Sequence, residues 1–118
     1  MQPFNLREHR FSAMEITSEI FEVGGGHLTS PEDAAIYLIK FGQESALVDA
    51  GCGLAMERLF ANIRKCGTDP QRIKYLLLTH CHYDHTGGAA ELKRRGGGVA
   101  ACAICGGLTQ GDACIIRV

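Results

Sequence analysis

The chain has 118 residues, of which 46% are hydrophobic and 21% are charged, and its mean hydropathy is +0.01. This composition is typical of a folded globular domain and excludes a disordered chain. Twelve basic and thirteen acidic residues leave a formal charge of −1, so no broad basic surface favours nucleic acid as a partner. No apolar run approaches the roughly 20 residues that span a bilayer, and no signal-peptide pattern opens the chain. We therefore expect a cytoplasmic protein without membrane contact.

The six cysteines are a second compositional feature. Without a secretory signal, thiols or metal ligands are expected more than disulfides. Cys102 and Cys105 form a Cys-x-x-Cys pair, but no second pair accompanies it and no helix start follows that would lower a thiol pKa. We interpret these two residues as thiols without a metal or redox role.

The N-terminal half of the chain predicts a flexible tail followed by strands. Residues 1–13 carry several charges and little periodicity, so the folded domain is expected to begin at Met14. A patterned stretch over 14–23 predicts the first strand, which three glycines end. Two short apolar runs, 35–39 and 45–49, are joined by Gly42-Gln43-Glu44 and predict a β-hairpin.

The hydrophobic period then changes over residues 54–66, which predicts an amphipathic helix. Its apolar stripe follows the helical period and consists of Met56, Leu59, Phe60, Ile63 and Cys66, with Gly67 as the C-terminal cap. A buried strand over 73–79, a short helix over 89–95 and a further strand over 99–104 follow. The order β, β-hairpin, α, β, α, β predicts an α/β layered domain over 14–104, with 105–118 as an atypical tail.

Three of the five histidines fall within six residues, together with one aspartate: His80, His82, Asp84 and His85. This cluster directly follows an apolar strand and precedes a helix. It therefore occupies the loop at the carboxyl end of a strand, where α/β sheets place their ligand sites. A solvated histidine-rich turn without a ligand is the plainer alternative.

The spacing of the cluster favours a metal site. His80 and His82 are two residues apart, so in extended backbone their side chains project to the same side and can share one ion. Asp84 and His85 lie past the bend and can face a second ion, or the water on the first. Neutral imidazoles with one carboxylate suit zinc, manganese or ferrous iron.

At this motif the sequence resembles the metallo-β-lactamase superfamily, which includes glyoxalase II-like thioester hydrolases. The resemblance rests on His80-x-His82-x-Asp84-His85 with Thr86-Gly87-Gly88, and on the strand-end segment Leu47-Val48-Asp49-Ala50-Gly51. It implies the N-terminal half of an αββα sandwich, in which two sheets lie between helices. This half would be a β-hairpin-rich sheet with flanking helices.

The resemblance also implies roles for individual residues. His80 and His82 would bind a first metal, and Asp84 and His85 a second, with zinc as the expected ion and iron or manganese as alternatives. Asp84 would also act in catalysis, and Asp49 would support the metal loop from behind without ligating. Family members carry further histidines in a second half, whereas here no histidine follows His85 and Asp112 is the only aspartate that does.

We therefore predict a metal-dependent hydrolase that acts on a small-molecule substrate, with a thioester or another small ester as the leading class. One alternative is a catalytically silent, truncated metal-binding fragment. Another is an iron-using oxidoreductase relative with the same ligands. Because a lone half of the fold would expose one sheet face, we also expect self-association through that sheet.

Overall fold

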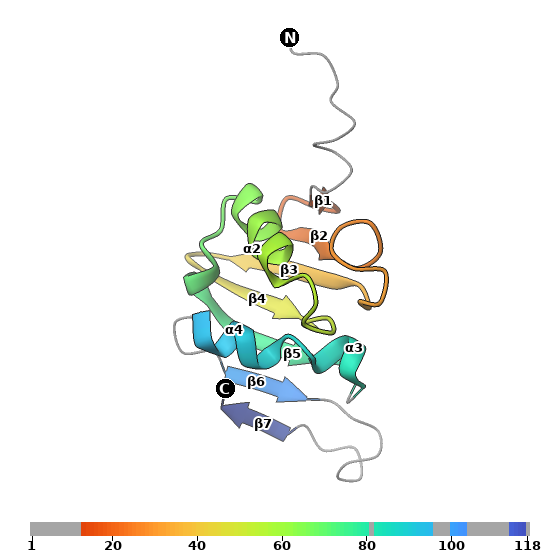
Figure 1. The fold of residues 1–118 in the computed structure, drawn as a ribbon. Helices are drawn as coiled ribbons and strands as arrows, with labels where there is room; N and C mark the ends of the chain where they lie inside the picture. Colours follow the sequence, from red (N-terminus) through yellow and green to blue (C-terminus); the bar gives the residue numbers. More distant parts are fainter. Residues whose placement is uncertain (1–12, 81, 96–99, 104–113, 118) are drawn as a thin grey trace.

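The computed structural model describes residues 13–80, 82–95, 100–103 and 114–117. In these segments seven strands form one sheet in sequential order. The strands are β1 (Met14–Glu15), β2 (Ile20–Gly24), β3 (Ile36–Phe41), β4 (Glu44–Val48), β5 (Ile73–Leu78), β6 (Ala100–Ala103) and β7 (Cys114–Arg117). The helices are α2 (Met56–Lys65), the 3-10 turn η1 (Pro70–Arg72), α3 (Tyr83–Thr86) and α4 (Ala89–Arg95) (Figure 1). This arrangement confirms the predicted α/β class.

Helix α2 follows the predicted stripe and ends at Lys65, and the predicted glycine, Gly67, lies directly after its C-cap Cys66. Gly67 has a φ of +82°, a left-handed conformation that a residue without a Cβ adopts at low cost. Gly67 N donates to Arg64 O (2.9 Å), and Thr68 N donates to Ile63 O (3.3 Å). These two bonds close the helix with a Schellman motif.

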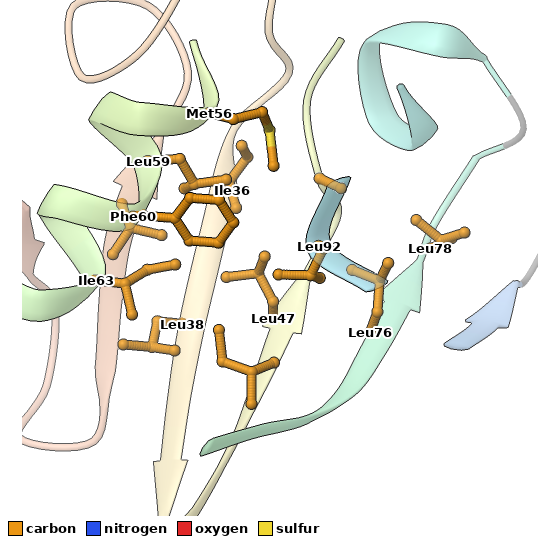
Figure 2. Close-up of a cluster of buried hydrophobic side chains, with 13 residues drawn as sticks. Ile36, Leu38, Leu47, Met56, Leu59, Phe60, Ile63, Leu76, Leu78 and Leu92 are labelled. Carbon is orange, nitrogen blue, oxygen red and sulfur yellow. The ribbon is translucent and has the colours of Figure 1, made fainter. Parts of the chain in front are cut away.

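The core lies between the helices and one face of the sheet. Figure 2 shows side chains of α2 packed over side chains of β3, β4 and β5, with Leu92 of α4 completing the cluster. Its fully buried members include Leu38, Leu47, Phe60 and Leu76. Because both α2 and α4 contribute to this cluster, they cover the same face of the sheet.

Two predicted strands differ from the structure in an informative way. The patterned stretch over 14–23 was expected to form one strand, but it folds into the antiparallel pair β1 and β2, with Met14 opposite Glu22. The Thr17 hydroxyl accepts hydrogen bonds from Glu19 N (3.2 Å) and Ile20 N (3.1 Å). This local bonding competes with the ladder and turns the chain.

Strand β5 was expected to be buried, and it is buried on one face only. Leu76 is fully buried, whereas Tyr75 and Leu77 are 43% and 38% exposed. The predicted hairpin is confirmed as β3 and β4, with Phe41 opposite Glu44 at its turn. Strand β4 then pairs with β5 in parallel, so the carboxyl ends of β4 and β5 meet at one edge of the sheet.

The face of the sheet away from α2 and α4 presents exposed apolar side chains. The rings of Phe41 and Tyr75 stack at 6.0 Å between centroids, and Leu77 lies on the same strand as Tyr75. Phe41 is 42% exposed. Exposed apolar side chains that are contiguous across neighbouring strands favour association.

We expect the purified chain to self-associate through this face, with Leu77→Lys shifting it toward the monomer because a charge in an apolar contact is costly to desolvate. Sedimentation velocity over a range of concentrations measures the effect. Leu54→Lys is a matched control, since Leu54 is 71% exposed in a loop. A wild-type chain that is monomeric at every concentration would contradict the expectation.

The remaining predictions on organisation have mixed outcomes. The short helix over 89–95 is confirmed as α4, and β6 lies within the predicted strand over 99–104. Strand β7 lies in the segment predicted as a tail and pairs antiparallel with β6. Residues 1–12 and Cys105 lie outside the described residues, so the flexible N-terminus and the Cys-x-x-Cys pair stay predictions. In the described segments no helix is long and apolar enough to cross a membrane.

Candidate metal centre

The predicted site residues gather at the carboxyl ends of β4 and β5. Asp49 follows β4 directly, and Thr79 and His80 follow β5. The chain then enters the short helix α3, which carries Asp84 and His85. Parallel pairing of β4 and β5 is what brings these segments to the same edge.

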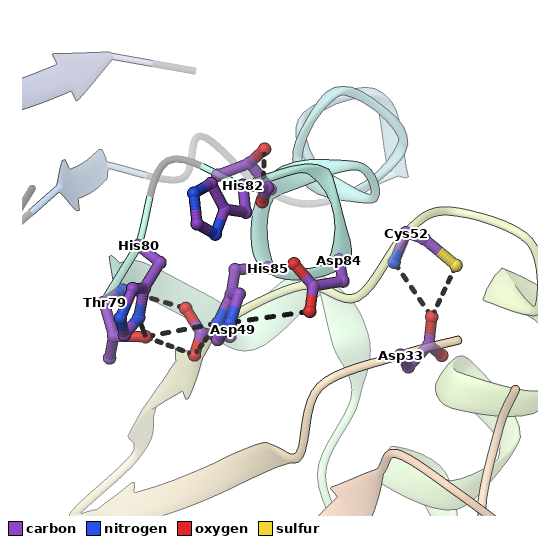
Figure 3. Close-up of polar contacts among 9 residues, drawn as sticks. Asp33, Asp49, Cys52, Thr79, His80, His82, Asp84 and His85 are labelled. Atoms are coloured by element: carbon purple, nitrogen blue, oxygen red, sulfur yellow. Dashed lines mark hydrogen bonds and ion pairs between the residues drawn. The ribbon is translucent and has the colours of Figure 1, made fainter. Parts of the chain in front are cut away.

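Asp49 is the buried centre of this arrangement (Figure 3). Its Oδ1 accepts from Thr79 N (2.8 Å), and its Oδ2 accepts from Thr79 Oγ1 (2.7 Å). Its Oδ2 also lies 2.9 Å from His85 Nδ1. Asp49 is only 4% exposed and has a φ of +66°, a conformation that non-glycine residues seldom adopt. The chain therefore holds this carboxylate in a strained, fully bonded position.

The contact between Asp49 and His85 determines which ring nitrogen of His85 is available. A carboxylate oxygen only accepts hydrogen bonds, so His85 Nδ1 carries the proton and donates it. In the neutral imidazole the other nitrogen, Nε2, keeps its lone pair, and it lies 3.7 Å from Asp84 Oδ2. A carboxylate behind the imidazole is the arrangement typical of histidines that bind metals.

His80 and His82 lie next to this pair and are exposed. The ring centroids of His80 and His85 are 4.6 Å apart, and those of His80 and His82 are 6.1 Å apart. His80 Nδ1 lies 3.2 Å from Thr79 Oγ1. Because that hydroxyl donates its proton to Asp49, it accepts from His80 Nδ1, so in the neutral ring of His80 the lone pair is on Nε2.

The donor types and one spacing fit a metal ion, although the full set does not converge. Among the described residues, no three His, Cys, Asp or Glu side chains form a group that could hold a metal. Ligands of a tetrahedral zinc with bonds of about 2.1 Å lie roughly 3.4 Å apart. The 3.7 Å between His85 Nε2 and Asp84 Oδ2 is close to that spacing. To complete a metal site, the exposed rings of His80 and His82 would have to turn toward His85 Nε2 and Asp84 Oδ2.

A second carboxylate, Asp33, lies in the turn that precedes β3. Its Oδ1 accepts from Cys52 N (2.9 Å) and Cys52 Sγ (2.8 Å), and its Oδ2 accepts from Thr29 Oγ1 (2.5 Å) and Ser30 N (3.3 Å). Burial alone would raise the pKa of Asp33, but these hydrogen bonds outweigh it and hold the pKa below its ordinary value. Burial, followed by the hydrogen bond to Asp33, raises the pKa of the Cys52 thiol.

No sequence pattern marked Asp33 or Thr79 as part of the site. Asp33 follows a Ser-Pro-Glu turn, a setting in which an aspartate commonly bonds its own backbone. Its partner Cys52 is nineteen residues further along the chain. Only the folded topology brings the two together, so no local signal could have identified the contact.

Two glycines of the predicted motif allow the loops to touch. A Cβ on Gly87 would lie 2.4 Å from Cys52 O, and one on Gly88 would lie 2.2 Å from Ala50 O. Both neighbours are backbone atoms and cannot move aside like a flexible side chain. Glycine is therefore required at these positions for α3 to pack against the loop that follows β4.

The fold and the strand-end histidines define a mixed-sheet α/β protein with an imidazole-rich loop at the carboxyl edge of its sheet. Residues 29–103, more than half of the chain, match the sequence profile described as the metallo-beta-lactamase superfamily. The chain belongs to this superfamily, as the histidine motif predicted.

Individual relatives agree with this assignment. The metallo-beta-lactamase BJP-1 of Bradyrhizobium japonicum is 33% identical to this chain, with a TM-score of 0.66. The match covers 77% of this chain and 32% of the BJP-1 chain. MIM-1 of Novosphingobium pentaromativorans is 30% identical with a TM-score of 0.65, and the match covers 76% of this chain and 30% of the MIM-1 chain. An atrochrysone carboxyl ACP thioesterase of Aspergillus fumigatus is 42% identical over 59 residues, which are 49% of this chain and 18% of that protein. The chain thus spans about a third of the length of these lactamases.

Proposed function

We propose that this chain carries metal-dependent hydrolase chemistry, with a thioester or another small ester as its substrate. The observation that carries the proposal is the row Asp49, His85 and Asp84 at the carboxyl edge of the sheet. The similarity to a thioesterase favours the thioester over other esters. Zinc is the proposed ion, with His80, His82, Asp84 and His85 as its ligands.

Each residue has a definite part in this chemistry. A bound divalent ion lowers the pKa of water and polarises the substrate carbonyl. The hydrogen bond from His85 Nδ1 to Asp49 makes Nε2 the nitrogen of His85 that can bind the ion. The hydrogen bond from His80 Nδ1 to Thr79 does the same for His80. The Asp84 side chain is 37% exposed, so its carboxylate can accept a hydrogen bond from the attacking water, take its proton and return it to the leaving group.

The second candidate is a chain that binds a metal without turnover. It is favoured by the observation that the described residues bring only the donor pair His85 Nε2 and Asp84 Oδ2 close to metal-ligand spacing and form no group of three. An ion with few protein ligands would face bulk water, and hydrolysis depends on the ligands and the substrate being held in a fixed geometry.

A hydrolysis assay separates the two candidates. The purified chain is tested on a panel of thioesters and small esters with added zinc, manganese or iron, beside Asp84→Ala. Zinc-dependent hydrolysis that Asp84→Ala lowers by about a hundredfold or more supports the hydrolase. Zinc binding with a rate no higher than that of the variant supports the silent alternative. A chain that binds none of the three ions contradicts both.

A further inference from the structure

The loop that follows β4 connects Asp33 to the helix that carries two of the proposed metal ligands. Asp33 bonds Cys52 of this loop, and a Cβ on Gly51 would lie 2.8 Å from the Asp33 carboxyl carbon. Gly51 also has a φ of +68°. The carboxylate therefore lies directly against the loop backbone, with no room for a side chain between them.

The same loop contacts α3 through its backbone. Ala50 N donates to His85 O (2.7 Å), and Gly88 N donates to Gly51 O (3.2 Å). The residue after Asp33 makes a separate link, since Ala34 N donates to Asp84 O (3.2 Å). Asp33 is thus anchored between the two segments that hold the backbone of His85 and of Asp84.

From these contacts we infer that Asp33 is a positioning residue, whose carboxylate fixes the 50–53 loop against α3 and so sets the spacing of Asp84 and His85. The inference rests on the proposed function, because it concerns the geometry of the proposed ligands. The Asp33 carboxylate joins its own loop to the loop that follows β4, and it acts on the two ligands through Cys52 and Ala34.

The chemistry of the neighbours explains why a carboxylate is needed. Four donors face Asp33: the backbone N–H and thiol of Cys52, the Thr29 hydroxyl and the Ser30 N–H. A carboxylate has only acceptors and can satisfy all four. An asparagine side chain would turn its NH₂ toward one pair of donors, so Asp33→Asn keeps about half of the bonds and Asp33→Ala keeps none.

The test begins with the metal-free chain. Amide hydrogen exchange at Ala50 and Gly88 is compared in wild type, Asp33→Ala, Asp33→Asn and the control Asp69→Ala. Asp69 is also a carboxylate that bonds a backbone N–H, that of Gln71 (2.9 Å), but it precedes β5 at the far end of the strand. Exchange should accelerate by about tenfold in Asp33→Ala and less in Asp33→Asn, while Asp69→Ala changes it little.

Two further readouts keep the outcome decisive. Alkylation of Cys52, followed by peptide mass mapping, should be several-fold faster in Asp33→Ala. Zinc affinity should fall by about tenfold in Asp33→Ala and be partly restored in Asp33→Asn. Unchanged exchange and alkylation in a folded Asp33→Ala would overturn the inference. Faster exchange with unchanged zinc affinity would overturn the link to Asp84 and His85. A wild type that binds no zinc defeats the proposed function, while unchanged exchange defeats only the role of Asp33.

Discussion

Replacing Asp49 with alanine should lower the free energy of unfolding by about 3–5 kcal/mol. The variant loses the bonds to Thr79 N, Thr79 Oγ1 and His85 Nδ1. These donors are only partly buried, so each lost bond costs about 1 kcal/mol, the low end of the range for unpaired groups. Alanine tolerates the left-handed φ of +66° less well than aspartate does, which adds about 1 kcal/mol. Urea unfolding followed by circular dichroism measures the change.

Two companion variants separate the hydrogen bonds from the backbone strain. Asp49→Gly removes the same bonds but tolerates the left-handed backbone, so it should be about 1 kcal/mol more stable than Asp49→Ala. Asp49→Asn keeps an acceptor for Thr79 N and should lose least. If all three variants unfold within about 0.5 kcal/mol of wild type, the carboxylate does not hold the site together.

Zinc binding should be limited to one ion per chain and should depend on His85. The described residues place one donor pair, His85 Nε2 and Asp84 Oδ2, at nearly the required spacing. His85→Ala should weaken zinc by more than about a hundredfold, because it removes a ligand and the link to Asp49. Isothermal titration calorimetry on the dialysed chain gives both the stoichiometry and the affinity.

His27→Ala is the control for this experiment, since His27 is an exposed histidine in the loop after β2. It should bind zinc as wild type does. Cobalt in place of zinc tests the donor type, because a thiolate ligand produces a charge-transfer absorption that imidazole and carboxylate do not. Two tightly bound ions, or equal affinities for His85→Ala and His27→Ala, would show that other residues form the site.

The success of prediction from the sequence depended on how local each signal was. The helix over 56–65 and its glycine cap follow from periodicity within a dozen residues. The histidine motif lies in one loop, so its place after a strand could also be predicted. Asp49 was expected to support this loop from behind, and in the structure its carboxylate accepts hydrogen bonds from Thr79 and His85 of the loop.

Other features cannot be predicted from the apolar pattern alone. The turn at Thr17 was missed because a hydroxyl bonded the backbone where the apolar pattern alone favoured one continuous strand. The exposure of Tyr75 and Leu77 was missed because an apolar run does not reveal whether one or both faces of a strand are covered. The bonds between Asp33 and Cys52 form only once the two loops are brought together, so no window of sequence contains them.

The parallel register of β4 and β5 also limits how this sequence can change in length. Val48 is level with Leu77, so Asp49 and Thr79 meet only while that alignment holds. An inserted residue within either strand would reverse the direction of every side chain beyond it and separate the two. Insertions between Gly53 and Asp69 leave the alignment intact, because α2 and its turns cross from one strand to the next outside the ladder. Length variation among homologues should therefore concentrate in that crossover and be absent from the two strands.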